Sequence, residues 1–420
     1  MEKNWVRQII LFLSSQTLSL FGSALVQYAI MWHITLESKS GAMMTIYIVC
    51  GFLPTFFLSP FAGVWADRYN RKLLIILADS LIAAATLVMA LLFVGGYDAM
   101  WLLFVIPAIR AAGTAVHMPA VAAFIPQLVP EDKLMKVNGA NGTIQAMVML
   151  IAPMISVGLL KWFSMETIFF IDVVTATIAI LALLLFLKVP AHKKAQNKQE
   201  LSYFRDMKDG FRYIGGSGYL KEYFVFSTFF LLLAAPVAFL TPLQVARTFG
   251  EDYWLLMAIE IAFSVGMMAG GVLIASWGGF KNKVYTMAAS SFLIGLSTAA
   301  MGVAPLFWLY LIFMGTAGLS MPLFNTPSTV LLQERVESNY LGRVFGVMGM
   351  LSSAMMPLGM LFFGPLADVV AIEWLLIVSG LAITLLGFLL LASKALLEAG
   401  KPLERKAETS DNDNRRNGVT

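Results

Sequence analysis

The sequence predicts an all-α polytopic membrane protein with twelve transmembrane helices in two six-helix halves. Twelve apolar stretches fill nearly the whole chain, most Lys and Arg of the connecting loops fall on one side, and a polar segment divides the stretches six and six. Hydrophobic residues make up 59% of the chain and charged residues 13%, about half the charged share usual in soluble domains. A soluble fold of this composition would lack the polar groups to cover its own surface.

Each apolar stretch is long enough to cross a bilayer. A helix spans the hydrocarbon core with about 20 apolar residues, because each residue rises about 1.5 Å. Only helices and closed barrels satisfy every backbone group in lipid, and barrel strands are shorter and alternate in polarity, so we expect helices. The predicted spans cover residues 9–34, 41–66, 73–94, 100–127, 137–162, 165–188, 220–247, 252–278, 282–302, 305–332, 343–368 and 372–396.

The basic residues predict the orientation of the chain. Cytoplasmic loops of membrane proteins carry an excess of Lys and Arg, and here these residues gather at the N-terminus, in alternate loops, in the central segment and in the C-terminal tail. The opposite loops carry only Lys39, Lys161 and Arg247. We therefore expect a multi-pass protein of the cell (plasma) membrane with both termini cytoplasmic. The formal net charge of +4 follows from this topology and does not indicate a nucleic-acid partner.

A polar, basic linker at residues 191–219 separates an N-terminal half (1–190) from a C-terminal half (220–397). Residues 398–420 form a charged tail that we expect to be cytoplasmic and disordered. The two halves resemble each other, since "GTAVHMPAVAAFIP" in the fourth span is echoed by "GLSMPLFNTPSTVL" in the tenth. Many secondary transporters are built from such a duplicated unit, with the substrate path between the copies.

The segment "GVWADRYNRK" after the second span is the sharpest local motif. Asp67 stands at the C-terminal end of a predicted helix, where the helix dipole disfavours an anion. Arg68, Arg71 and Lys72 are close enough in sequence to compensate it, and Gly63 allows another helix to approach. We interpret this motif as a gate that holds the two halves together at the cytoplasmic mouth in one state. Ordinary anchoring by positive charges is the alternative, and it explains the cations but not Asp67.

Four ionisable residues lie well inside predicted spans, namely Asp79, Arg110, Asp172 and Glu260. Such residues are costly in lipid and are functional candidates by default. By the rise per residue, Arg110, Asp172 and Glu260 lie in the outer half of the bilayer, where they could share one cavity, and Asp79 lies in the inner half. We interpret all four as candidates for proton coupling, with Glu260 and Asp79 first and Asp172 third. Structural ion pairing between helices is the alternative for each.

Polar side chains also follow one face of two predicted spans. They are Gln16, Ser19, Ser23 and Gln27 on the first span, and Thr114 and His117 after Arg110 on the fourth. Polar side chains on one helical face in a membrane must face protein or water. We expect these six residues to line a central substrate cavity, and hydrogen bonding between helices is the alternative.

The motif residues Gly63–Lys72 resemble the loop signature G-x-x-x-D-R-x-x-R-K of the major facilitator superfamily. The chain also resembles the drug-efflux branch of that family that includes the macrolide-efflux permeases, through "ILADSLIAAA", "IRAAGTAVHMPA", "QLVPEDKL" and "YLGRVFG". The resemblance implies a twelve-helix facilitator fold and proton-driven export of amphipathic drugs. The second half departs from the signature, because "SWGGFKNK" keeps the cations and glycines but has no Asp.

The chain contains no nucleotide-binding loop of the form G-x-x-x-x-G-K-[ST], no nucleophile–base motif and no Cys/His cluster, and Cys50 is its one cysteine. We therefore expect a secondary active transporter rather than an enzyme, with no cofactor and no metal. Its expected partners are a small-molecule drug, protons and membrane lipid, and we expect it to act as a monomer.

Macrolide antibiotics are the first substrate candidates, and tetracyclines, other lipophilic compounds or a siderophore stay open. A transport-inactive membrane sensor or a membrane-embedded enzyme is the alternative of a different class. An enzyme would gather its polar catalytic groups at one membrane face, whereas the intramembrane charges of this chain are spread in depth.

Overall fold

The computed structural model describes residues 2–130, 133–187 and 203–402. Within these ranges every secondary-structure element is an α-helix, and twelve helical segments are long and apolar enough to cross a membrane. The twelve predicted spans are therefore confirmed. Residues 188–202, which include the start of the predicted linker, and residues 403–420, most of the predicted tail, lie outside the described ranges.

The helices follow the chain as two sets of six spans with short helices added to the second set. The first half contains α1 (Glu2–Ser38), α2 (Gly41–Arg68), α3 (Arg71–Val94), α4 (Leu102–Leu128), α5 (Leu134–Trp162) and α6 (Met165–Phe186). The second half contains α8 (Gly218–Phe239), α9 (Thr241–Thr248), α10 (Tyr253–Trp277), α11 (Lys283–Gly302), α12 (Phe307–Arg335), α13 (Ser338–Leu366), α14 (Ile372–Ala392) and α15 (Lys394–Ala399). Between the halves lies α7 (Tyr203–Gly216).

The amphipathic stretch expected in the linker forms α7, which packs on α13 and α8. The Tyr213 ring stacks on Tyr340 at the start of α13, with ring centroids 4.2 Å apart. Gly210 packs closely on Val347 and Arg343 of α13, so that an added Cβ would lie 3.2 Å from the Val347 side chain. The linker helix is thus attached to a helix that borders the junction between the halves.

The predicted span 220–247 is confirmed as one membrane span, Gly218–Thr248, and within it the helix is divided at Leu240 into α8 and α9, because Pro242 has no N–H for a bond to the preceding turn. The predicted tail begins later than residue 398, since α15 continues to Ala399 and buries Leu396. The backbone N–H of Lys283 also donates to the Gly400 carbonyl at 3.1 Å, which attaches these residues to the second half.

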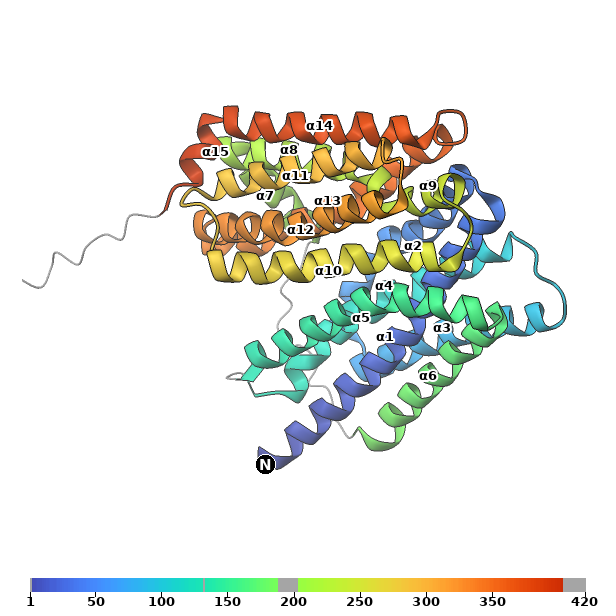
Figure 1. Cartoon of the computed structure of the whole chain (residues 1–420). Helices are drawn as coiled ribbons and strands as arrows, with labels where there is room; N and C mark the ends of the chain where they lie inside the picture. The colour runs from blue at the N-terminus through green and yellow to red at the C-terminus, as the bar shows by residue number, and fades with distance from the viewer. Residues whose placement is uncertain (1, 131–132, 188–202, 403–420) are drawn as a thin grey trace, which may run out of the picture.

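The two halves meet at the end of the molecule opposite Glu2 and α15, and they diverge toward the end where those segments lie (Figure 1). We call the first the closed end and the second the open end. One buried apolar cluster joins both halves at the closed end and includes Leu25, Met44, Leu243 and Leu376. At the open end each half has a separate buried cluster. The helix pairs α2–α13 and α5–α10 make the main contacts between the halves.

Candidate functional site

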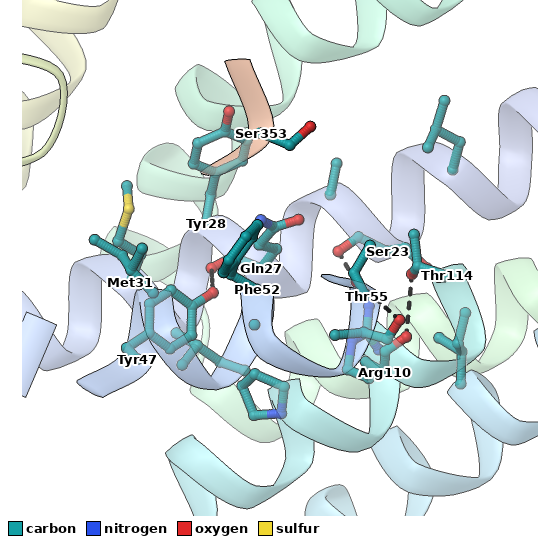
Figure 2. A pocket seen from close by; sticks show the side chains of 18 of the residues that line it. Ser23, Gln27, Tyr28, Met31, Tyr47, Phe52, Thr55, Arg110, Thr114 and Ser353 are labelled. Carbon is teal, nitrogen blue, oxygen red and sulfur yellow. Dashed lines mark hydrogen bonds between the residues drawn. The ribbon is translucent and has the colours of Figure 1, made fainter. Parts of the chain in front are cut away.

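A cavity of about 500 Å³ lies between the halves, bordered mainly by α1, α2 and α4 (Figure 2). Only Phe239 and Ser353 among its lining residues belong to the second half. On α1 the lining side chains recur every three or four residues, as one face of a helix requires. The lining residues are Leu20, Ser23, Ala24, Gln27, Tyr28, Ile30, Met31, Tyr47, Ile48, Gly51, Phe52, Thr55, Ile82, Pro107, Arg110, Ala111, Thr114, Phe239 and Ser353.

Arg110 of α4 forms a buried ion pair with Asp172 of α6 at the wall of this cavity. Its Nη1 lies 2.5 Å from Asp172 Oδ2 and also donates to the Thr86 hydroxyl, and its Nη2 donates to the Ser23 carbonyl at 3.1 Å. Asp172 is fully buried and accepts further hydrogen bonds from Thr86 at 3.0 Å and Ser23 at 3.2 Å. Both charges therefore have a counter-charge and hydrogen-bond partners, which a buried ion pair needs in order to be tolerated.

The three charges expected in the outer half of the bilayer occupy different places. Arg110 lines the cavity, and Asp172 lies behind it without reaching the cavity surface. Glu260 is half-buried on α10 and is not among the lining residues. Of the three, Arg110 alone lines this cavity, and the proton-coupling role of all three stays a prediction.

The residues of the two predicted polar stripes also lie only partly at the cavity. Ser23, Gln27 and Thr114 line the cavity, as expected. The other three members, Gln16, Ser19 and His117, are not among the residues that line this cavity, and their place in a substrate cavity stays a prediction. Helical spacing identified one face of each helix correctly, but α3 covers the part of that face near Asp79.

Ser19 and His117 instead contact Asp79 of α3. The Ser19 hydroxyl donates to Asp79 Oδ1 at 3.4 Å, and His117 Nε2 lies 3.3 Å from the same oxygen. The His117 contact is within ion-pair distance but lacks hydrogen-bond geometry, since Nε2 has no hydrogen-bond partner. Asp79 itself is only 3% exposed.

The predicted gating motif lies at the open end and connects helices of the first half. Arg71 donates from Nε to the Ala66 carbonyl at 2.9 Å and from Nη1 to the Ala123 carbonyl at 2.8 Å. Lys72 donates to the Leu187 carbonyl at 2.7 Å, just beyond α6. Arg68 is exposed, and Asp67 lies in the last turn of α2 with its side chain outside the described part of the structure. The gating role of this motif stays a prediction.

Asp368, directly after α13, caps the N-terminus of α2 across the junction of the halves. Its carboxylate accepts hydrogen bonds from the backbone N–H groups of Gly41 at 2.8 Å and Ala42 at 3.0 Å and from the Ser40 hydroxyl at 2.7 Å. These N–H groups have no partner within their own helix, and the helix dipole favours an anion there. Burial acts to raise the pKa of Asp368, but the hydrogen bonds from Ala42, Ser40, Gly41 and Arg247 outweigh it and hold this pKa below its ordinary value.

Arg247 of α9 and the loop between α1 and α2 complete this contact. Arg247 Nη2 lies 3.0 Å from Asp368 Oδ1, and its Nε donates to the Lys39 carbonyl at 3.2 Å. Lys39 adopts a left-handed backbone with φ 48° and pairs through its ammonium with Glu251. We call Lys39, Ser40, Arg247, Glu251 and Asp368 the closed-end cluster. The sequence did not predict this cluster, although it places the basic residues Lys39 and Arg247 in loops on the side opposite the basic, cytoplasmic loops.

Glycines bring α2 and α13 into backbone contact beside this cluster. A Cβ on Gly41 would overlap the Gly364 carbonyl, and one on Gly364 would overlap the Thr45 side chain. The Thr45 hydroxyl donates to the Met360 carbonyl at 3.0 Å, from the first half to the second. At Gly63 near the open end, in contrast, no atom in the described part of the chain lies within 4 Å of an added Cβ.

The sequence also missed the aromatic and apolar part of the cavity wall. Tyr28, Met31, Tyr47 and Phe52 surround its middle, and the Tyr47 hydroxyl donates to the Gln27 carbonyl at 2.6 Å (Figure 2). Apolar periodicity does not distinguish a cavity-facing side chain from a lipid-facing one, so no signal in a single sequence selects these four. Among the described residues, no group of three or more His, Cys, Asp or Glu side chains is placed to hold a metal ion.

Comparison with known proteins assigns the family. A model of the Major Facilitator Superfamily matches residues 9–360. The chain is 29% identical over 384 residues to macrolide efflux protein A of Streptococcus pyogenes, an alignment that covers 90% of this chain and 95% of that protein. It is 30% identical over 321 residues to macrolide efflux protein A of Enterococcus faecalis, covering 76% of this chain and 99% of that protein. The chain therefore belongs to the major facilitator superfamily.

More distant similarities agree with this assignment. The multidrug efflux pump Tap of Mycobacterium bovis is 24% identical over 405 residues, covering 93% of this chain and 94% of that pump. A bacterial homologue of the human lysosomal transporter Spinster, in an inward-facing and unoccupied conformation, matches with a TM-score of 0.66 at 15% identity, covering 96% of this chain and 100% of that chain. The nucleoside transporter NupG matches with a TM-score of 0.66 at 16% identity, covering 93% of this chain and 98% of that chain. At these identities the two structures show the fold alone.

The protein is therefore a multi-pass membrane transporter of small molecules, homologous to macrolide and multidrug efflux proteins. This confirms the predicted fold class and the predicted family.

Proposed function

We propose that this chain exports an amphipathic drug, most favourably a macrolide antibiotic, in exchange for protons by alternating access. The cavity between the halves, with a buried ion pair at its wall, is the observation that carries the proposal. Drug-binding sites have volumes of about 300–1,000 Å³ and combine apolar walls with a few polar groups. The similarity to macrolide efflux protein A supports the macrolide as the first substrate to test.

The cavity wall matches an amphipathic ligand chemically. Tyr28, Tyr47 and Phe52 offer aromatic surface, and Met31 adds an adaptable thioether side chain. Gln27 and Arg110 supply hydrogen-bond donors at the same wall. A ligand with an apolar ring and hydroxyl or amine substituents would find a partner for each part.

The orientation belongs to the same proposal. With both termini in the cytoplasm, the open end faces the cytoplasm and the closed end faces outward, so the drug enters from inside. Export then requires the closed-end cluster to separate and the open end to close, with Asp67 and Gly63 contributing to the second contact. In this proposal residues 1–190 and 220–397 are the two moving units of a monomer.

Proton coupling is assigned to the acids near the cavity. A proton on Asp172 would remove the counter-charge of Arg110 and leave the guanidinium free to turn toward a ligand. Asp79 and Glu260 are the other candidates, and one exchange step needs at least one acid that is protonated on one side and deprotonated on the other.

The test is the accumulation of a labelled macrolide in susceptible cells that express this chain, with and without a protonophore. We expect low accumulation that rises to the empty-vector level when the proton gradient collapses. Asp172→Asn should lose this protonophore-sensitive export, and Asp98→Asn, in an exposed loop, is the matched control that should keep it. Empty-vector accumulation in cells that contain the wild-type protein in the membrane would contradict macrolide export, and tetracycline would then be the next ligand.

A further inference from the structure

The linker helix α7 has one face packed on its own chain and one face that is exposed. Gly210 and Ile214, one turn apart, are buried in the contact with α13 and α8. Lys208, Phe211 and Arg212 are also within one turn of one another, and all three are exposed, the Phe211 ring by 48%. An exposed aromatic ring between two exposed cations therefore marks the outer face of this helix.

The contacts with α13 give the depth of α7 in the bilayer. α7 runs antiparallel to the start of α13, since Tyr213 stacks on Tyr340 and Gly210 packs on Val347. The membrane span of α13 begins one residue before Tyr340, so these contacts lie about 2 and 12 Å along it. Its 28 residues measure about 42 Å, enough for the hydrocarbon core and both headgroup layers. Since the span of α8 also begins directly after α7, at Gly218, α7 lies where lipid headgroups meet acyl chains.

The exposed face of α7 is chemically complementary to an anionic membrane surface. Helices in this layer place Lys and Arg at lipid phosphates and aromatic side chains at the acyl boundary. Neither Lys208 nor Arg212 has a hydrogen bond or ion pair with another described residue, the neighbouring Asp209 included, so both cations are available to a ligand. A soluble anion would use the two cations but leave the Phe211 ring in water, whereas a phospholipid supplies a partner for all three side chains.

We propose that Lys208, Phe211 and Arg212 form a binding site for an anionic phospholipid, with the phosphate at the two cations and an acyl chain against the Phe211 ring. The site lies on the membrane surface at the open end, apart from the drug cavity. The Tyr213–Tyr340 stack fixes α7 to α13, and the backbone N–H of Glu337 donates to the Tyr213 hydroxyl at 3.3 Å. A lipid bound to α7 therefore also holds the start of α13 and stabilises the folded protein.

Thermal unfolding of the purified full-length protein in detergent, with added lipid, measures this binding. Phosphatidylglycerol should raise the unfolding midpoint of the wild type more than the same amount of phosphatidylcholine, because a ligand of the folded state stabilises it. Lys208→Gln combined with Arg212→Gln should need about thirtyfold more phosphatidylglycerol for the same rise, since each cation near an anionic surface contributes about fivefold to binding. Lys281→Gln combined with Lys394→Gln removes the same charge from two exposed lysines at the same end and is the matched control.

Two further variants separate lipid binding from a structural role of the same residues. Lys208→Arg combined with Arg212→Lys keeps both charges and should respond to phosphatidylglycerol as the wild type does. Phe211→Ser should weaken the response, because it removes the surface that contacts the acyl chain. Inorganic phosphate in place of lipid should leave the wild-type midpoint unchanged for the same reason.

The proposal is overturned if both lipids shift the wild-type midpoint equally, or if the variant without Lys208 and Arg212 keeps the full response to phosphatidylglycerol. An equal loss of response in the lysine control would assign the effect to overall charge and overturn the proposal too. An unchanged response in Phe211→Ser, or a shift caused by inorganic phosphate, would contradict a lipid as the ligand. The measurement contains no drug and no proton gradient, so its failure is distinct from a failure of the transport proposal.

Discussion

The two ends of the junction between the halves are built differently. At the closed end α2 and α13 touch through Gly41 and Gly364, and Asp368 of one half caps a helix of the other. At the open end, no described residue lies within 4 Å of a Cβ added at Gly63 of α2 or Gly346 of α13. The two helices α2 and α13 thus carry a tight contact at one end and small residues without close neighbours at the other.

The charges at the closed end are also unlike the buried pair near the cavity. The side chains of Lys39 and Glu251 are 44% and 58% exposed, whereas those of Arg110 and Asp172 are 9% and 0% exposed. Exposed ion pairs contribute about 0–1 kcal/mol, and breaking a buried pair costs about 3–5 kcal/mol. The closed end is therefore held by the shared apolar cluster, by backbone packing and by the helix cap, and none of these contacts leaves a deeply buried charge unpaired when it is broken.

The largest expected effect comes from adding bulk at the closed end. Gly364→Val would overlap the Thr45 side chain and the Gly41 carbonyl, so we expect a loss of about 1–3 kcal/mol in the stability of the closed contact. Gly346→Val, at the open end, has no neighbour to meet and is the matched control. Thermal unfolding of the purified variants measures the difference, and equal shifts would contradict the contrast between the two ends.

A smaller effect is expected from removing the cap. Asp368→Ala leaves the N–H groups of Gly41 and Ala42 without their acceptor and removes a partner of Arg247, which should cost about 0.5–2 kcal/mol. The ratio of closed to separated ends should then fall by up to about tenfold to thirtyfold. Distances between spin labels placed on either side of the closed end report this ratio. Asp98→Ala should leave the distances unchanged.

The Lys39–Glu251 pair should matter less than the cap. Glu251→Gln removes an exposed ion pair and should cost no more than about 1 kcal/mol. Lys39→Gly removes the same pair but also relieves a left-handed backbone that glycine adopts freely. We therefore expect Lys39→Gly to be the more stable of the two by thermal unfolding. The opposite order would indicate that the ion pair outweighs the backbone strain.

A change of pH near neutrality should have the smallest effect on the closed-end contact made by Asp368. The pKa of Asp368 is lower in the folded protein than its ordinary value of about 3.9, so its stabilising contribution is complete above that value and is lost as the pH falls through the lowered pKa. The contribution of Asp368 to the spin-label distances at the closed end should thus stay constant between about pH 5 and 8 and change only in stronger acid. In Asp368→Asn the acid transition should disappear. A transition near neutral pH that persists in Asp368→Asn would assign pH sensing to another group.

Hydropathy was sufficient for the spans but not for their contacts. Twelve apolar runs predicted twelve membrane segments because lipid demands continuous apolar helices. The division of the seventh span at Leu240 was missed, since Pro242 lies in a run whose hydropathy is unbroken. Because Arg110 and Asp172 lie inside predicted spans, the sequence identified both as functional candidates. Their pairing with each other could not be predicted, because it depends on how α4 and α6 pack.

The helical spacing of the polar residues identified one face of each helix, but it did not identify which helix or cavity that face contacts. The stripe from Gln16 to Gln27 is one face of α1, yet Ser19 contacts Asp79 of α3 whereas Ser23 and Gln27 face the cavity. The closed-end cluster was not predictable, because Asp368 and Ser40 are 328 residues apart and meet only when the two halves dock.

The uneven contribution of the halves to the cavity has a consequence for how such transporters diversify. Nearly every lining side chain is encoded in the first 114 codons, with Phe239 and Ser353 as the exceptions. If this cavity binds the exported drug, as proposed above, recombination that exchanges the second half between related genes would leave the drug preference with the donor of the first half. Clinical or laboratory selection for a new drug should accumulate substitutions in that part of the gene.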